Sequence, residues 1–377
     1  MNVAGAKLGA VVMMAFSLML ARCTGSLSSG ATPSTTTAIH AAGRTQVPIT
    51  PTAVTGADGY FWLAGTYPCA SGTCSALMES TDGGSTWGRI GSAPMPTDRL
   101  VFANRLDGFA SSQYFPVILY QTSDGGRNWH QAHSAGWLAS PVLLSGGKAY
   151  ALSYRCHIQG CTSYALVSSP VAEDDWRVVT SFDARTTKGE NPCLVVHGQR
   201  IWVFLVPDGG GSGGAVLVST SFGRSFSSIR PDPLATGSFG CDLSATSASV
   251  LWGMCYGLHS SSQARSTDGG GHFLFPLVAS DVFPGSVLYP ISGDEAVLLF
   301  ANEDKNNDQY LVNNLQVTSD GGESFRVVLN QNVVSVAFAA SGRWLAWAVA
   351  PTSVDINAIW LTTNGGRTWQ AYEPPRV

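Results

Sequence analysis

The octet Ser-Thr-Asp-Gly-Gly-Ser-Thr-Trp, residues 80–87, decides the fold, because versions of it recur along the whole chain. Four further copies keep the pattern: TSDGGRNW at 122–129, STDGGGHF at 266–273, TSDGGESF at 318–325 and TTNGGRTW at 362–369. Two copies are degenerate, STSFGRSF at 219–226, which lacks the Asp, and SSPVAEDDW at 168–176. The chain is therefore a repeat protein of seven units, about 47 residues apart.

Each octet is predicted to be a tight turn between two strands, since apolar runs flank it on both sides. An Asp side chain can accept hydrogen bonds from backbone N–H groups a residue or two ahead, and glycines can adopt the positive φ of such a turn. The hydroxyl two positions before the Asp can add a bond across the turn. The residues assigned to these turns are Asp82, Asp124, Asp268, Asp320 and Asn364.

An aromatic residue closes every copy and begins the outgoing strand. A ring of this size is expected to lie between neighbouring sheets, where it buries a large apolar area. The better preserved copies supply Trp87, Trp129, Phe273, Phe325 and Trp369.

The last unit shows the strand pattern of one repeat, with four apolar runs at 333–341, 344–351, 358–364 and 368–373. The other units align to it, and the repeat length is typical of a propeller blade. The sequence therefore predicts an all-β, seven-bladed β-propeller with four antiparallel strands per blade. Because the first and last units both contain four strands in order, closure is expected to depend on blade packing, with no strand exchanged between the termini.

The octet resembles the Asp-box, or BNR, repeat S-x-D-x-G-x-T-W of the sialidase-like superfamily, and the resemblance covers roughly residues 47–375. Proteins with this repeat include sialidases, xyloglucan hydrolases, sortilin-type receptors and photosystem II assembly factors. The resemblance implies that the boxes are structural and lie on the face away from any active site. A single propeller of seven blades is nearest in architecture to the photosystem II assembly factors, which implies a noncatalytic scaffold or receptor.

Composition agrees with an exported all-β domain, because 45% of the residues are hydrophobic, only 12% are charged, and there are 42 Gly. One uninterrupted repeat series indicates a single domain over residues 47–377. The formal net charge of -4 argues against a nucleic-acid partner, which normally requires a basic face.

The first 46 residues differ in character from the repeats. Residues 1–23 are predicted to be a signal peptide, since Lys7 precedes an apolar stretch of signal-peptide length at 8–21. The segment ends Leu-Ala-Arg-Cys and resembles a bacterial lipobox, which implies lipidation of Cys23, although Arg22 departs from that pattern. Ordinary signal cleavage is the alternative. Residues 24–46, rich in Ser and Thr, are expected to form a flexible linker, so membrane contact is expected only through the N-terminal signal or lipid.

Cysteine spacing indicates an oxidising compartment. Cys69 with Cys74, and Cys156 with Cys161, have the same separation and are expected to close equivalent loops in blades 1 and 3 as disulfides. Cys241 and Cys255 are predicted to pair across one hairpin, and pairing of Cys193 with Cys241 is the alternative. Metal binding is the rival interpretation of the paired cysteines, and no metal or other cofactor is predicted.

In propellers of this type, the connections between strands D and A and between strands B and C share one face, which is the usual ligand face. A protein or glycan at the cell surface is the expected partner. The candidate ligand-face residues are Asp98, Arg99, Arg155, His157, Asp208, His259, Asp304 and Asp355.

A glycoside hydrolase of the sialidase or xyloglucan hydrolase type is the alternative function. Hydrolysis by that route needs two carboxylates across a cleft, and nothing in the sequence pairs any two of the candidates. The Arg-Ile-Pro motif of sialidases is absent, since residues 46–50 read QVPIT. No catalytic residue is therefore assigned.

Overall fold

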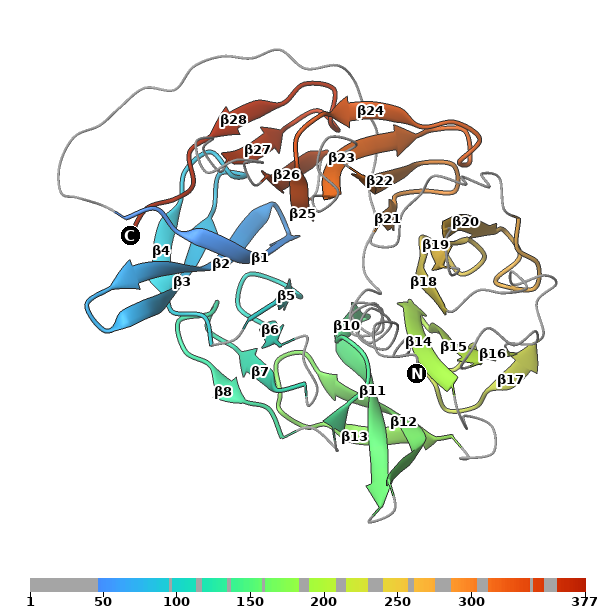
Figure 1. The fold of residues 1–377 in the computed structure, drawn as a ribbon. Coiled ribbons are helices and arrows are strands. Elements are labelled where there is room, and N and C mark those ends of the chain that lie inside the picture. Colours follow the sequence, from blue (N-terminus) through green and yellow to red (C-terminus); the bar gives the residue numbers. More distant parts are fainter. Residues whose placement is uncertain are drawn as a thin grey trace, which may run out of the picture.

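A computed structural model of the chain confirms the seven-bladed β-propeller, with its blades arranged as a ring (Figure 1). The structure describes residues 47–94, 97–112, 117–133, 137–157, 160–182, 190–207, 215–229, 240–256, 261–274, 286–303, 311–339, 342–348 and 358–377. Each sheet is antiparallel and is built from strands that follow one another in the sequence.

The first three blades have the following strands. Blade 1 contains β1 (Thr50–Ala57), β2 (Tyr60–Cys69), β3 (Gly72–Ser80) and β4 (Gly88–Gly91). Blade 2 contains β5 (Arg99–Phe102), β6 (Gly108–Ser111), β7 (Leu119–Thr122) and β8 (His130–Gln131). Blade 3 contains β10 (Leu143–Ser145), β11 (Lys148–His157), β12 (Gly160–Pro170) and β13 (Arg177–Ser181), and β9 (Trp137–Leu138) also pairs with β11.

The remaining four blades continue around the ring. Blade 4 contains β14 (Glu190–His197), β15 (Arg200–Pro207), β16 (Ala215–Ser219) and β17 (Ser227–Ile229). Blade 5 contains β18 (Gly240–Ala245), β19 (Leu251–Tyr256) and β20 (Ser261–Ser266), and Leu274 pairs with Arg265 at the position of a fourth strand. Blade 6 contains β21 (Val287–Pro290), β22 (Ala296–Glu303), β23 (Leu311–Thr318) and β24 (Arg326–Leu329). Blade 7 contains β25 (Val333–Ala339), β26 (Arg343–Ala348), β27 (Ala358–Thr362) and β28 (Gln370–Tyr372).

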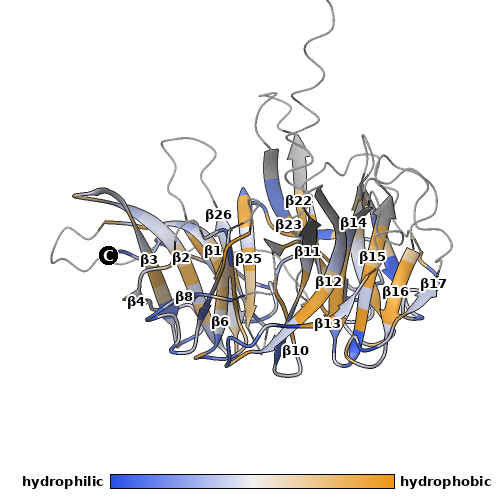
Figure 2. Ribbon diagram, turned by 90° about the horizontal axis from the view of Figure 1, so that it is seen from below, coloured by the Kyte–Doolittle hydropathy of each residue, from blue (hydrophilic) through white to orange (hydrophobic). Residues whose placement is uncertain are grey.

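The hydrophobic core consists of seven separate layers, each between two adjacent blades. The layer between blades 1 and 2, for example, joins Trp62 and Leu77 to Leu100 and Phe102. The Trp62 and Phe102 rings stack with their centroids 4.1 Å apart. Strand side chains alternate between the two faces of a sheet, so each blade contributes to the layer before it and to the layer after it. Hydrophobic residues accordingly lie along β2, β12 and β15 (Figure 2).

The octet aromatics take part in these layers. Phe273 and Trp369 are buried, with 3% and 2% of their surface exposed, and Phe325 packs against the layer between blades 5 and 6. Trp129 meets Phe102 edge to face, with the ring centroids 6.2 Å apart. The rings therefore lie between neighbouring sheets, where their buried area stabilises blade contacts.

The second octet glycine is required by the neighbouring blade. Gly84 has a φ of 99°, and a Cβ there would lie 2.8 Å from a Leu361 methyl group of blade 7. At Gly126 a Cβ would lie 2.3 Å from a methyl group of Leu77 in blade 1. Any larger residue would push the blades apart, in addition to the cost of a left-handed backbone.

Closure of the ring includes a contact that the sequence did not predict. The sheets of blades 1 and 7 exchange no strand, as expected, but the segment before β1 pairs with the segment after β28. Val47 N donates to Val377 O at 3.1 Å, Val377 N donates to Val47 O at 3.0 Å, and Ile49 N donates to Pro375 O at 3.0 Å. Closure therefore combines side-chain packing with backbone hydrogen bonds, and blades 1 and 7 lie side by side (Figure 1).

The described residues include no helix that is both long enough and apolar enough to cross a membrane.

We predict that Ile49→Ala lowers the free energy of unfolding by about 2–5 kcal/mol, because it leaves a cavity in a closed layer. Ile49 is 2% exposed and packs in the layer between blades 7 and 1. Urea unfolding measures the change. Val327→Ala serves as the control, since Val327 is 44% exposed and should change stability by no more than about 0.5 kcal/mol. A similar small change for Ile49→Ala would show that this layer is not needed for closure.

Candidate functional site

The inner strands surround a cavity of about 250 Å³ on the axis of the ring. Its lining comes mainly from the beginnings of inner strands in five blades, numbers 1, 2, 3, 6 and 7, with further residues from β6, β7 and β22. Inner strands begin at the connections between strands D and A, and they end on the same side as the octets. The cavity thus lies toward the face opposite the octets, which we call the mouth face.

Two of the candidate residues lie in this cavity. Asp98 and Arg99 both line it, at the beginning of β5. The backbone of Asp98 is fixed by its N–H group, which donates to Ser111 O at 3.1 Å. Sequence adjacency places two opposite charges in one cavity, where they can orient a polar ligand.

Sequence reasoning missed the other polar lining residues, Thr52, Ser111, Tyr289 and Ser335. They supply three hydroxyl groups and a phenol from four different blades. Thr52, Tyr289 and Ser335 follow the start of an inner strand, and Ser111 ends β6. Nothing in the local sequence distinguishes them from other strand residues. Val54, Val101, Val142 and Val336 are among the apolar residues of the same wall.

A second cavity of about 380 Å³ lies deeper, toward the octet side, between blades 2, 3, 4 and 5. It shares Val101 and Val142 with the first cavity. Its lining is mainly aliphatic, with His197 and Ser145 among the polar exceptions. The inside of the ring is thus polar toward the mouth face and more apolar toward the octets.

The side chains of the remaining six candidates fall outside the described residues. Arg155 and His157 lie near the end of β11, and their side chains fall outside the described residues. Asp208, His259, Asp304 and Asp355 also lie outside the described residues.

The octet carboxylates are engaged within their own turns. Ser80 Oγ donates to Asp82 Oδ1 at 2.8 Å and accepts from Gly84 N at 2.7 Å. Asp82 Oδ1 also accepts from Thr86 N at 2.9 Å, and its Oδ2 accepts from the Thr86 hydroxyl at 2.7 Å. The main backbone donor is therefore four residues ahead, farther than the one or two expected from the sequence, because the turn curls back around the carboxylate.

The same network recurs with different donors in the other octets. Asn128 and Ser324 take the place of Thr86 around Asp124 and Asp320. In blade 7 an amide replaces the carboxylate, and Asn364 Oδ1 accepts from Thr368 N at 3.0 Å. A hydrogen-bonding oxygen at the third position is thus enough to hold the turn, whether or not it carries a charge.

The hydrogen bonds change the acidity of these carboxyls. Burial opposes ionisation of Asp82 and Asp124, but hydrogen bonds from the turn outweigh it, and the pKa of each lies below its usual range. In blade 5 burial likewise opposes ionisation, while bonds from His272 and Ser266 lower the pKa of Asp268 to about 2. For Asp320 the side-chain bonds from Ser324 and Thr318 are the main cause of a lowered pKa.

The two degenerate octets are held by other means. In blade 4, Ser221 stands at the third position, and its hydroxyl accepts from Ser225 N at 3.3 Å. In blade 3 the turn is held from blade 2, since Gln121 Nε2 donates to Val171 O and Glu173 O, both at 3.0 Å. Asp174 reaches back and accepts from His133 N at 3.0 Å. In blade 3, contacts from blade 2 therefore add to bonds within the turn, where Ser169 Oγ donates to Glu173 O at 2.6 Å.

Arginines on the octet side also join neighbouring blades. Arg105 forms an ion pair with Glu79 of blade 1, at 3.1 Å, and Arg200 Nη1 donates to Ala248 O of blade 5 at 2.6 Å. Arg343 Nη1 donates to Asp82 O across the closure between blades 7 and 1, at 2.9 Å. These side chains contribute to the contacts between blades.

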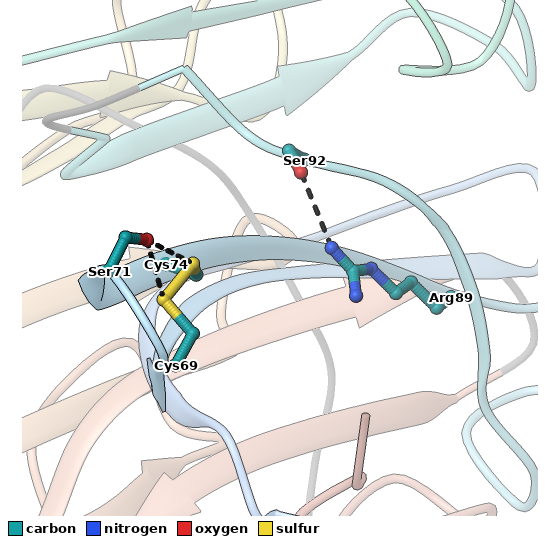
Figure 3. The surroundings of a disulfide bond; sticks show 5 residues. All are labelled: Cys69, Ser71, Cys74, Arg89 and Ser92. Atoms are coloured by element: carbon teal, nitrogen blue, oxygen red, sulfur yellow. Dashed lines mark hydrogen bonds between the residues drawn. A yellow bond between two sulfur atoms is a disulfide. The ribbon is translucent and has the colours of Figure 1, made fainter.

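Cys69 and Cys74 form a disulfide at the tip of the β2–β3 hairpin, as predicted (Figure 3). The Ser71 hydroxyl lies 3.3 Å from the sulfur of Cys69. Cys193 and Cys255 each take part in a disulfide as well. The side chains of Cys156, Cys161 and Cys241 fall outside the described residues, although the backbones of Cys156 and Cys161 are register partners across their hairpin, as are those of Cys241 and Cys255.

Within the described part of the chain, no three His, Cys, Asp or Glu side chains are grouped so that they could hold a metal ion.

Comparison with known proteins identifies relatives by fold only. No protein family and no curated protein matches the chain. Among solved structures, it is similar to a Mycobacterium tuberculosis puromycin-hydrolyzing peptidase, with a TM-score of 0.56 and 14% identity over 94% of this chain and 58% of that one. It is also similar to the Pyrococcus horikoshii acylaminoacyl peptidase, with a TM-score of 0.56 and 8% identity over 87% of this chain and 52% of that one.

The β-propeller domain of the Trilobed protease from Pyrococcus furiosus matches with a TM-score of 0.53 and 6% identity, over 84% of this chain and 95% of that one. The chain thus spans little more than half the length of the two peptidases and nearly all of an isolated propeller domain. At these identities the similarity establishes the propeller fold.

We predict that Asp268→Asn makes the protein less sensitive to acid. The pKa of Asp268 is about 2 in the fold, below its ordinary value of 3.8, so its contribution to stability is complete above about pH 4 and is lost as the pH falls toward 2. Asn does not titrate in this range, so the variant cannot lose this contribution to stability by protonation. At neutral pH the substitution should cost less than about 1 kcal/mol, because the contact between Asp268 and His272 is largely exposed.

Thermal unfolding midpoints between pH 7 and pH 2.5 measure the effect. The reciprocal variant, Asn364→Asp, places a carboxylate in the blade 7 octet and should make stability fall more steeply in acid. Equal acid sensitivity of the wild type and Asp268→Asn would contradict the assignment.

Proposed function

We propose that the chain is an exported, noncatalytic propeller that binds a protein or a glycan through its mouth face. The observation that carries the proposal is the axial cavity, where Asp98 and Arg99 lie together with hydroxyl groups from other blades. Ligand sites in proteins commonly combine an apolar wall with a few convergent polar groups. The cavity has this composition, since valines alternate with the polar lining.

The octets also support the view that one face is structural and the opposite face binds the ligand. We propose that they are Asp-box repeats, on the basis of the recurring bonds from a hydroxyl and a backbone amide to one side-chain oxygen. Their carboxylates are used within the turns, and arginines on that side join blades. The polar groups of the octet face thus serve the fold, which favours ligand binding at the opposite face.

A glycoside hydrolase is the second candidate, favoured by one observation, the Asp98 carboxylate in the cavity. Hydrolysis would need a second carboxylate roughly 5 to 10 Å away. Binding needs only the groups that the cavity already presents, so we place it first. The propeller peptidases share the fold, and their chemistry is not transferred to this chain.

The test of the ligand site is a screen of the exported protein against a glycan array, a set of glycoside substrates and cross-linked surface proteins. We predict that Asp98→Asn with Arg99→Gln weakens binding at least about tenfold, because hydrogen bonds to charged groups contribute more than neutral ones. If the wild type hydrolyses a glycoside and Asp98→Asn abolishes this turnover, a glycoside hydrolase replaces the proposal.

A matched control is available on the octet face, where Glu323 and Arg367 are exposed at the same position of two octets. Glu323→Gln with Arg367→Gln removes the same pair of charges and should leave binding unchanged. Equal loss in both double variants would mean that general charge, and not the cavity, governs binding.

We also propose that residues 1–23 direct export, that Cys23 carries a lipid, and that residues 24–46 tether the propeller to a membrane. The support is the apolar segment before Cys23 and the uncharged, Ser/Thr-rich composition of most of the linker. A single acyl chain anchors weakly and more than one anchors stably.

Growth of expressing bacteria with labelled palmitate should label the wild-type protein, and Cys23→Ser should abolish the label and release the protein from membranes. An unlabelled wild-type protein in the medium would instead establish ordinary signal cleavage.

A further inference from the structure

Blades 6 and 7 meet at the mouth face in a group of carboxamide side chains. Asn313 lies near the start of β23, and Asn330, Gln331 and Asn332 form the connection from β24 to β25. We call these four residues the carboxamide strip. The connection contains no other residue type, so the concentration of amides at this junction is a property of the sequence itself.

The fold brings the two parts of the strip together. Leu315 of β23 is the register partner of Leu329 at the end of β24, so Asn313 lies beside the connection that follows. Asn313 N donates to Asn332 Oδ1 at 3.2 Å. The chain then turns into β25, with Val333 N donating to Gln331 O at 2.8 Å. The backbone at the junction is therefore fixed, while Asn330 and Gln331 are exposed.

The strip continues into the axial cavity. Val334 and Ser335 follow it directly in β25, and both line the cavity. Val334 is 50% exposed, an unusual exposure for a valine at the beginning of an inner strand. Tyr289 lines the same cavity from blade 6 and packs against Phe338, with the ring centroids 5.4 Å apart. A ligand in the cavity can therefore extend over Val334 onto the amides without leaving the surface.

The chemistry of this path is neutral. A carboxamide offers both donors and an acceptor, which matches the hydroxyl groups of a sugar, each of them also donor and acceptor. Val334 and Tyr289 supply apolar surface for the C–H faces of sugar rings. Residues 311–317 and 327–342 contain no Asp, Glu, Lys, Arg or His, so these two segments carry no charge with which to attract an ionic polymer.

A protein partner would be expected to dock on different residues. The most strongly binding positions of protein interfaces are enriched in Trp, Tyr and Arg, and the strip consists of Asn and Gln. We infer that the carboxamide strip is an outer subsite for a neutral glycan chain, one end of which occupies the axial cavity. The inference rests on the proposed function and specifies its ligand class.

The experiment measures affinity of the full exported chain for soluble polysaccharides by gel electrophoresis through a polymer-containing gel and by calorimetry. The neutral probes are a β-glucan, a galactomannan and a xyloglucan, and the charged probe is polygalacturonate. The test variant is Asn330→Ala with Gln331→Ala, whose side chains are exposed and outside the core layers. Binding to a neutral polymer should weaken at least about tenfold, as expected for the loss of hydrogen bonds from two side chains.

The matched control is Gln131→Ala with Gln370→Ala, which removes two exposed carboxamides from the outer strands β8 and β28. It should bind as the wild type does, and both double variants should unfold at the wild-type temperature.

Three results would overturn the inference. Unchanged binding of the Asn330→Ala, Gln331→Ala variant, with binding lost in the Asp98 and Arg99 variant, would leave the proposed function standing and remove the subsite. Preference of the wild type for polygalacturonate would contradict a neutral ligand. Binding to none of the polymers would also overturn the inference. The proposed function would then require a surface protein that cross-links to the wild type and not to the Asp98 and Arg99 variant.

Discussion

Apolar contact between adjacent blades is the interaction on which the rest of this structure depends. Each of the seven layers is formed by two sheets that cannot bury their faces alone. The ring has to close, because an open series of seven blades would leave the outer faces of blades 1 and 7 exposed. Phe61 and Leu345 meet in the closing layer and are both fully buried. Backbone pairing of Val47 and Val377 adds hydrogen bonds at the edge of this layer.

The same constraint explains the chemistry of the two faces. Turns on the octet side must hold their shape while a neighbouring blade packs closely against them, as Leu361 does against Gly84. Their hydroxyls, amides and carboxylates are therefore bonded inside the turn or to the next blade. At the beginnings of inner strands, Asp98 and Arg99 line the axial cavity. The proposed ligand site thus lies at the end of the inner strands opposite the octets.

The sequence predicted what is local and missed what depends on closure. The octet specifies its turn within eight residues, so blade number and strand order follow from its recurrence. Pairing of Val47–Ile49 with Pro375–Val377 joins segments without a repeat signature, and the proline-rich second segment does not resemble a strand. Asp98 and Arg99 could be selected because they begin a unit. Tyr289 could not be selected, because it lines the cavity only once the ring has brought blade 6 next to the axis. Asn313 likewise contacts Asn332 only through the strand register of blade 6.

Blade 3 shows how a repeat can lose its signature and remain a blade. Its turn lacks the usual third-position carboxylate and is held both by its own Ser169 hydroxyl and by Gln121 of blade 2, while Asp174 bonds back to His133. The information that specifies this turn is therefore divided between two repeats. Substitutions at Gln121 and in the blade 3 turn are no longer independent of one another, and blade 3 could not be moved to another place in the ring without blade 2. The copy that lacks the signature thus depends on its neighbour for part of its turn geometry.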